Sequence, residues 1–105
     1  MVDLNTFKQI ALAFEHAVEQ PHFEKPSYRI HQRIFATLDE KNYRATLKLS
    51  EVDQSVFCSI DPSIIYPVKG TWGKQGWTII ELNKIPKSLL TDAISAAYKT
   101  TSTKK

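Results

Sequence analysis

The first apolar positions of the chain recur at three- and four-residue steps, as they do along one face of a helix. These positions are Leu4, Phe7, Ile10, Ala11, Phe14 and Ala17. Either Asp3 or Asn5 can cap the start of this predicted helix. It spans residues 4–17 and ends before Pro21, because proline is excluded from helix interiors.

The period then changes to two from Val18 to Leu49, which predicts a meander of antiparallel strands with one apolar and one polar face. We place turns at Gln32–Arg33 and at residues 39–42. With a simple pairing register, the polar face carries the basic residues Arg29, Arg44 and Lys48. A one-residue slip of the register would move these side chains to the opposite face.

The second half of the chain predicts a short helix, one strand and a final helix. Ser50 is a suitable N-cap for a helix that continues through Cys58, and residues 61–67 form a turn-rich connector. Residues 77–82 form a strand, and Pro86 suits the first turn of the last helix. Its apolar stripe consists of Leu89, Leu90, Ala93, Ile94, Ala97 and Tyr98.

These elements predict an α+β fold: an antiparallel sheet of about five strands with N- and C-terminal helices packed on one face. A chain of 105 residues fits one domain. We assign that domain to residues 1–98 and expect residues 99–105, which lack core-forming side chains, to be a disordered basic tail.

Composition adds expectations about the environment. The single cysteine, Cys58, excludes an internal disulfide and fits a reducing compartment. We recognise no signal peptide and no run of about 20 apolar residues that would span a membrane. We therefore expect a cytoplasmic monomer without a membrane partner.

The net charge of +3 comes from the three lysines of the tail, since without them 11 basic residues balance 11 acidic ones. The distribution is more informative than the total. Residues 25–48 carry a net charge of +4 and residues 69–87 a net charge of +3, while residues 49–68 between them carry −3. Positive charge is thus confined to two segments.

All three glycines and both tryptophans lie within residues 70–77. Glycine tolerates positive φ and close backbone approach, so this segment predicts an ordered turn of unusual geometry. We expect Trp72 to be exposed and Trp77, which begins a strand, to belong to the core. The glycine spacing matches neither the dinucleotide-binding fingerprint nor the P-loop.

No pattern in the sequence indicates catalysis. Cys58 sits among apolar neighbours, as a buried structural cysteine does. His16, His22 and His31 lie on separate elements without metal-ligand spacing. We predict that the protein is not an enzyme and binds no metal or cofactor.

Several motifs, taken together and in order, resemble the MmcQ/YjbR family of small bacterial proteins. The resemblance covers residues 7–98 and rests on residues 21–30, 34–38, 44–49, 66–67 and 73–78. It implies a fold similar to the frataxin/CyaY superfamily and a proposed double-wing DNA-binding surface made of two β-hairpins. Iron binding of the frataxin type is disfavoured, because the first helix offers only Asp3 and Glu15, with Lys8 between them.

Three functional hypotheses follow. The first is DNA binding of low sequence specificity, in which cationic side chains contact phosphates and Trp72 supports one wing. The cations are Lys25, Arg29, Arg33, Arg44, Lys48, Lys69 and Lys74. The second is a protein-interaction module anchored by the Trp72 loop. The third is a small-ligand pocket under that loop, lined by His22 and Tyr66. The basic strand face is equally compatible with a solvated surface that serves solubility alone.

Overall fold

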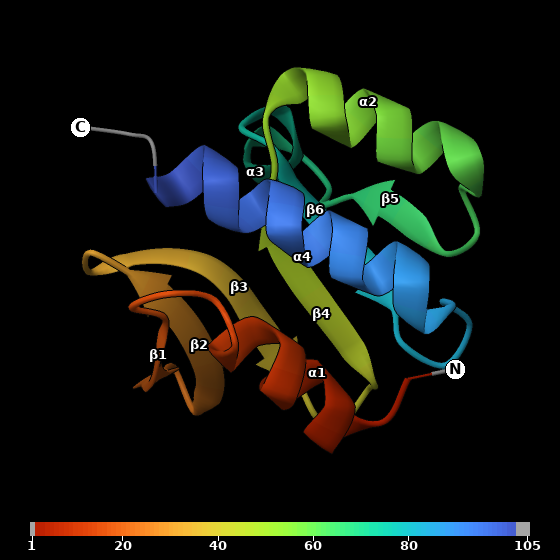
Figure 1. Cartoon of the computed structure of the whole chain (residues 1–105). Helices are drawn as coiled ribbons and strands as arrows, with labels where there is room; N and C mark the ends of the chain where they lie inside the picture. The colour runs from red at the N-terminus through yellow and green to blue at the C-terminus, as the bar shows by residue number, and fades with distance from the viewer. Residues whose placement is uncertain (1, 103–105) are drawn as a thin grey trace.

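The structure is a computed structural model that describes residues 2–102, and a six-stranded sheet forms its centre (Figure 1). In chain order the elements are α1 (Leu4–Leu12), β1 (Val18–His22), β2 (Lys25–Ile30), β3 (Arg33–Asp39), β4 (Arg44–Lys48), α2 (Glu51–Ile60), β5 (Ile65–Pro67), α3 (Thr71–Lys74), β6 (Trp77–Glu81) and α4 (Lys87–Ser102).

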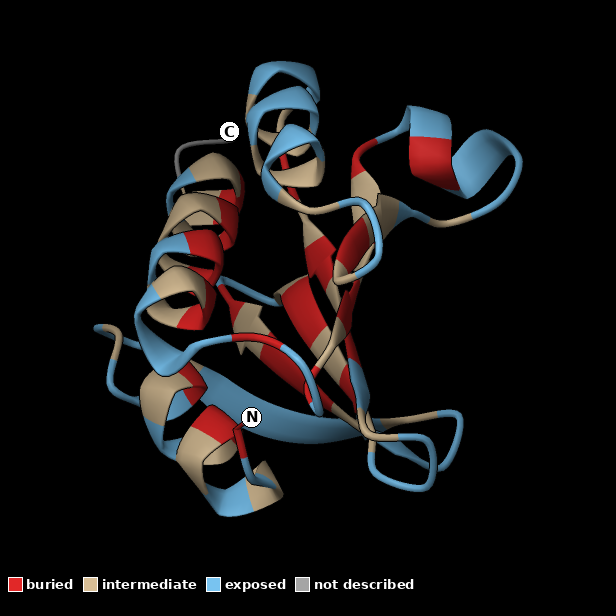
Figure 2. Ribbon diagram, turned by 90° about the vertical axis from the view of Figure 1, so that its right-hand side faces the viewer, coloured by how far each residue is buried: buried red, intermediate tan, exposed pale blue. Residues whose placement is uncertain are grey.

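The sheet is antiparallel throughout, with strand order β1-β2-β3-β4-β6-β5. Helices α1 and α4 lie on the same face of it, whereas α2 packs beside β5 at one edge (Figures 1 and 2). The predicted α+β class is confirmed. The strand number is six, because residues 65–67 of the predicted connector pair with β6 as a short edge strand.

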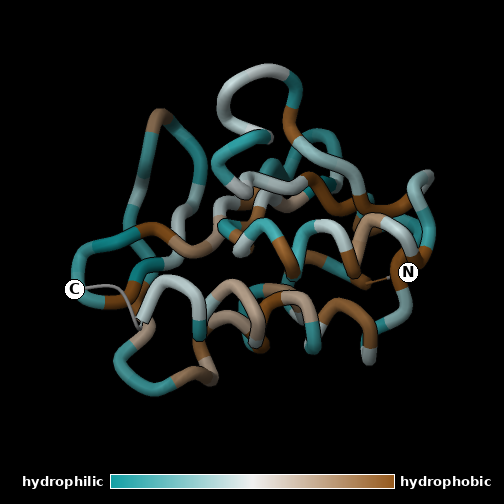
Figure 3. Tube along the Cα trace, turned by 90° about the horizontal axis from the view of Figure 1, so that it is seen from above, coloured by the Kyte–Doolittle hydropathy of each residue, from teal (hydrophilic) through white to brown (hydrophobic). Residues whose placement is uncertain are grey.

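The core lies between the sheet and the two helices α1 and α4. Phe7 of α1 meets Tyr28 of β2 edge to face, with ring centroids 5.6 Å apart, and both side chains are fully buried. Leu90 and Ile94 of α4 are fully buried as well. The apolar stripes appear in Figure 3 as brown bands that recur along the helical turns.

A β-bulge divides the sheet between β2 and β3. Tyr28 pairs with Ala36, but the next residue, Arg29, pairs with Ile34, so that Phe35 is skipped. Phe35 and Ala36 are consecutive and both fully buried, which a regular alternation would not allow. The bulge therefore turns Ile34 toward the face that α1 and α4 leave uncovered.

One turn and one helix end differ from the sequence predictions. The β2–β3 turn is made by His31 and Gln32, both at positive φ, so Arg33 is the first residue of β3 and not part of the turn. Helix α1 ends at Leu12, five residues before the predicted end at Ala17. His16 has φ of 65°, a left-handed conformation that does not continue a helix, and it redirects the chain toward β1.

The predicted disordered tail is wrong for residues 99–102, which form the last turn of α4. Thr101 is only 4% exposed, so this turn belongs to the packed molecule. Residues 103–105 lie outside the described residues. Within residues 2–102, no helix has the length and apolar character needed to cross a membrane.

Candidate functional site

One face of the sheet carries no helix of the described chain over β2, β3 and β4, and we call it the open face. Residues paired across antiparallel strands point to the same side. Arg29 pairs with Ile34, Arg44 with Glu81, and Lys48 with Trp77. Because the neighbouring residues Ala45 and Leu47 are buried in the core, Arg44 and Lys48 point to the open face. The prediction that Arg29, Arg44 and Lys48 share one face is confirmed.

Lys25 joins the open face, but Arg33 does not. Lys25 pairs with His22 at the end of the β1–β2 hairpin. Arg33 pairs with Ile30, which is buried against the helices, so the register directs Arg33 to the covered side. The structure thus separates Arg33 from the other cations, because the β2–β3 turn lies one residue earlier than predicted. A phosphate contact of Arg33 stays a prediction.

Two of the cations are neutralised by carboxylates on the same face. Lys25 Nζ lies 3.6 Å from Asp39 Oδ2, and Arg44 Nε lies 3.0 Å from Glu81 Oε2. Hydrogen bonds from Asn42, together with Lys25, hold the pKa of Asp39 below its ordinary value. These pairs lower the positive potential at Lys25 and Arg44.

Arg29 and Lys48 are each oriented by contacts on the open face. Arg29 Nε donates to Ser27 Oγ at 3.1 Å, and Ser27 Oγ donates to the Gln20 carbonyl at 2.6 Å. Lys48 Nζ donates to the carbonyl oxygen of Gln75 and lies 5.7 Å from the ring centroid of Trp77. A neutral acceptor orients the Arg29 guanidinium without cancelling its charge, so this position favours an anion.

The remaining predicted residues lie in the connection between β5 and β6. Lys69, Trp72 and Lys74 are all exposed there, and Trp72 stands in the single turn of α3. The expected exposure of Trp72 is confirmed, at 61%.

The glycines of this connection have the unusual geometry that the sequence predicts. Gly70 and Gly76 have φ of 79° and 103°. A Cβ at Gly73 would lie 1.8 Å from the Val68 carbonyl oxygen, so the backbone of α3 approaches the preceding segment very closely. Gln54 of α2 adds a hydrogen bond of 2.9 Å to the Gly73 carbonyl. The platform that carries Trp72 is therefore tightly held.

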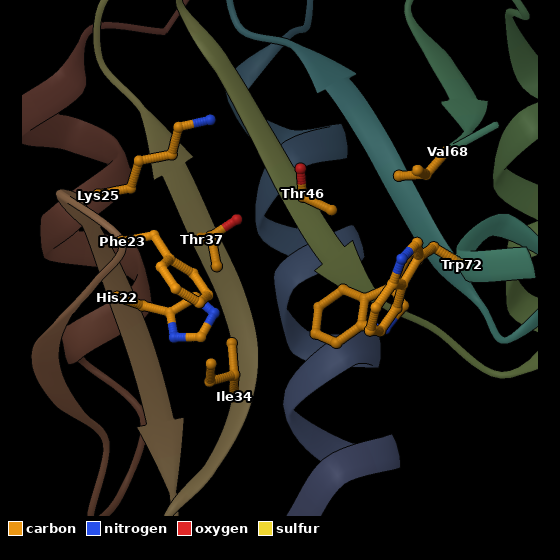
Figure 4. Close-up of a pocket in the computed structure, with 9 residues that line it drawn as sticks. His22, Phe23, Lys25, Ile34, Thr37, Thr46, Val68 and Trp72 are labelled. Atoms are coloured by element: carbon orange, nitrogen blue, oxygen red, sulfur yellow. The ribbon is translucent and has the colours of Figure 1, made fainter. Parts of the chain in front are cut away.

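A groove of about 460 Å³ crosses the open face between the β1–β2 hairpin and α3 (Figure 4). His22, Phe23 and Lys25 line one side, Val68, Trp72 and Trp77 line the other, and Ile34, Thr37 and Thr46 form the floor. The expected pocket under the Trp72 loop thus exists and includes His22, but Tyr66 is not among its lining residues.

Two aromatic residues of the groove depart from the sequence predictions. Trp77 is half-buried and lines the groove instead of belonging to the core, because its register with Lys48 turns it to the open face. Phe23 was not predicted as a site residue, although it is 87% exposed. The available signal was an aromatic residue at the centre of the polar, proline-flanked segment 21–26.

The chemistry of the described residues is sparse. Among residues 2–102, no group of three or more His, Cys, Asp or Glu side chains is placed to hold a metal ion. Cys58 is half-buried, and burial raises the pKa of its thiol, which lowers the thiolate fraction at neutral pH. The absence of metal and of catalysis remains a prediction.

Comparisons with known proteins place the chain in a structural context. A family model described as YjbR matches residues 12–100. No curated protein matches the chain. A crystal structure of the Deinococcus radiodurans protein DR2400, which has a DUF419 domain, superposes with a TM-score of 0.85 at 19% identity. The match covers 99% of this chain and 81% of that one, and it supports the same fold.

Proposed function

Because the chain belongs to the YjbR family, as its motifs indicate, we propose that it binds DNA with low sequence specificity through the open face. The β1–β2 hairpin and the β5–β6 connection serve as the two wings, and the strands between them form the floor. The proposal involves no catalytic step and no cofactor. It takes the protein to act as a cytoplasmic monomer, as the sequence predicts.

The observation that carries the proposal is a set of four cations around the groove. Arg29 lies on β2 of the first wing, Lys48 lies on the floor strand β4, and Lys69 and Lys74 lie on the second wing. Lysine and arginine that neutralise phosphates release condensed counterions, whatever the base sequence. Two further cations, Lys25 and Arg44, contribute less, because carboxylates on the same face already balance their charge.

The test is fluorescence anisotropy of a labelled duplex of about 20 base pairs, two helical turns, titrated at low and near-physiological salt. If about four phosphates are neutralised, log affinity falls with log salt at a slope of about −3 to −4. Arg29→Glu combined with Lys48→Glu should weaken binding at least tenfold and flatten that slope, since two phosphate contacts are lost.

Lys87→Glu is the matched control, because Lys87 begins α4 on the covered side and glutamate suits a helix N-terminus. It makes the same kind of charge change and should bind as the parent protein does. Lys69→Glu combined with Lys74→Glu tests the second wing at exposed positions that a substitution should not unfold. Unchanged affinity in both double variants would refute the proposal.

The exposure of Trp72 also favours a second candidate, a protein-interaction module. Tryptophan is a frequent anchor of protein interfaces, and here it is 61% exposed on a tightly held helical turn. Trp72→Ala would then abolish capture of a partner protein from cell extract while leaving thermal stability unchanged. A captured partner that is indifferent to Trp72→Ala would count against this candidate.

A further inference from the structure

We propose that the groove of the open face holds an unpaired nucleobase, so that the protein binds single-stranded or locally unpaired DNA more tightly than an intact duplex. This inference rests on the proposed DNA binding and specifies the form of DNA that is bound. The groove volume, about 460 Å³, lies within the range of about 300–1,000 Å³ of small-molecule sites. A duplex can only lie across such a groove, whereas a single base can enter it.

The two sides of the groove present aromatic surface to solvent. Phe23 is 87% exposed and Trp72 is 61% exposed, and they stand on opposite sides of the groove (Figure 4). Every base has an aromatic face, and stacking on such side chains strengthens binding without sequence preference. Half-buried Trp77 adds a third ring to the lining of the groove.

The backbone at Phe23 has a left-handed conformation that a bulky side chain rarely adopts. Phe23 and Glu24 are the two central residues of the β1–β2 turn, with φ of 52° and 68°. Such turns strongly prefer asparagine and glycine, and a bulky residue at positive φ is a genuine outlier. Strained positions of this kind cluster at functional sites. We take the strain to maintain an aromatic side chain at the rim of the groove.

The floor offers hydrogen bonds that a base edge can use. Thr37 and Thr46 are directly paired across β3 and β4, and both line the groove. Neither hydroxyl has a hydrogen-bond partner in the part of the chain that the structure describes. A hydroxyl both donates and accepts, so the pair can meet any base without selecting one. This matches DNA binding of low sequence specificity.

Charge completes the site for a strand and not only for a base. Lys25 lies at the hairpin side of the groove, where Asp39 balances part of its charge, and Lys48 lies beside Trp77 on the other side. A strand whose base enters the groove would pass its flanking phosphates near these two ammonium groups. A duplex must break base stacking and pairing to reach that arrangement, whereas a strand that is already unpaired does not.

The experiment compares three labelled DNAs of equal length: a single strand, a duplex, and the same duplex with a short central mismatched bubble. The single strand and the bubble should bind about tenfold more tightly than the duplex, since one stacked base contributes about 1.4 kcal/mol. A mononucleotide, dAMP, is titrated by quenching of tryptophan fluorescence. If dAMP binds as tightly as the single strand does, the groove is a site for free nucleotides, and the proposal that it binds a base of a DNA strand is wrong.

The variant Phe23→Asn shows whether a loss of DNA binding comes from the missing aromatic ring or from unfolding of the protein. Asparagine suits the turn, so this variant should unfold at a higher temperature than the parent protein while losing the preference for unpaired DNA at least threefold. Trp72→Ala should lose the same preference, and Trp72→Phe should retain most of it. Val52→Ala, an exposed apolar truncation on α2, is the control and should change nothing.

The outcomes separate the two proposals. Equal affinity for all three DNAs, with salt-dependent binding that still requires Arg29, would overturn the groove assignment and leave the proposed function standing. Full retention of the preference for unpaired DNA in both Phe23→Asn and Trp72→Ala would overturn the groove assignment as well. Failure of every DNA to bind at low salt would overturn both proposals.

Discussion

Individual residues at positive φ shape both sides of the groove. Phe23 and Glu24 reverse the chain between β1 and β2, while Gly70 and Gly76 bracket the turn that carries Trp72. Glycine adopts positive φ without a steric clash because it has no Cβ, whereas the Cβ of Phe23 makes the same backbone conformation unfavourable. The side that carries Trp72 therefore depends on glycine conformations that other residues would disturb, whereas asparagine or glycine would suit the turn at Phe23.

Gly76→Ala tests the close approach of the second wing to the sheet. A Cβ at this position would lie 1.9 Å from the Leu49 carbonyl oxygen, and φ is 103°. The left-handed backbone alone costs about 1–2 kcal/mol, and the clash adds to it. Urea denaturation should therefore show a loss above about 2 kcal/mol. Gly70→Ala, which meets no atom within 4 Å, should lose less; equal losses would contradict this account.

We expect the free energy of unfolding to depend on pH through the carboxyl group of Asp39. Hydrogen bonds from Asn42, first its side-chain amide, and the Lys25 ammonium lower the pKa of Asp39 in the folded protein. The resulting stability is present above the ordinary aspartate pKa of about 4 and is lost as pH falls through the lowered folded value.

Asn42→Ala should therefore flatten the decline in unfolding free energy between about pH 5 and pH 2, as measured by urea denaturation at several pH values. Asn5→Ala, an exposed substitution on α1, serves as the control and should keep the parent slope. A decline of unchanged steepness in the Asn42 variant would mean that Asp39 contributes nothing to the acid sensitivity.

At the scale of elements, the two edges of the sheet are protected from pairing with other strands in different ways. Strand β1 is an exposed edge whose Pro21 pairs with Pro26 of β2, and proline lacks the donor that edge-to-edge pairing needs. Strand β5, the opposite edge, has only three residues and lies beside α2. Helix α2 thus protects one edge and, through Gln54, supports the platform under Trp72.

Capping of α2 can be tested separately from its packing. Ser50 Oγ accepts a hydrogen bond of 3.1 Å from the Asp53 amide, as the sequence predicts for an N-cap. Ser50→Ala should lower the free energy of unfolding by about 1 kcal/mol in urea denaturation. Ser59→Ala makes the same chemical change in the last turn of α2 and should cost less than about 0.5 kcal/mol. If Ser59→Ala lowers the free energy of unfolding more than Ser50→Ala does, Ser50 is not the stabilising cap of α2.

At the scale of the whole molecule, the helices cover one face of the sheet and leave the other to the groove. α4 is the main cover and contacts β2, β3 and β4. Its final turn is not a tail, since Thr101 is buried. The stability of the sheet that carries the open face thus depends on the packing of a helix on its far side.

Ending the chain after Tyr98 tests that dependence. The truncation removes the buried Thr101, and we expect the melting temperature to fall by about 5 °C or more, since 1 kcal/mol corresponds to about 4–8 °C in a domain of this size. Thr101→Asp in the full chain should produce a comparable fall, because it places a charge at a buried position. A truncated protein that melts with the parent would restore the domain boundary at residue 98.

The periodicity of apolar residues was enough to predict the α+β class, because it depends on residues close together in the chain. The cap at Ser50 followed from the residue type, and the family followed from the resemblance of several motifs taken in order. The common face of Arg29, Arg44 and Lys48 also followed from simple alternation. Clustering of glycine predicted the unusual turn around Trp72, since few other residues adopt its backbone angles.

Only the tertiary structure placed Arg33 on the covered side, turned Trp77 to the groove and set Phe23 opposite Trp72. It also revealed which cations Asp39 and Glu81 neutralise. These features depend on a bulge, on strand register and on contacts between residues distant in the sequence. A one-residue change of register reverses the direction of every side chain beyond it, and no local pattern determines that register.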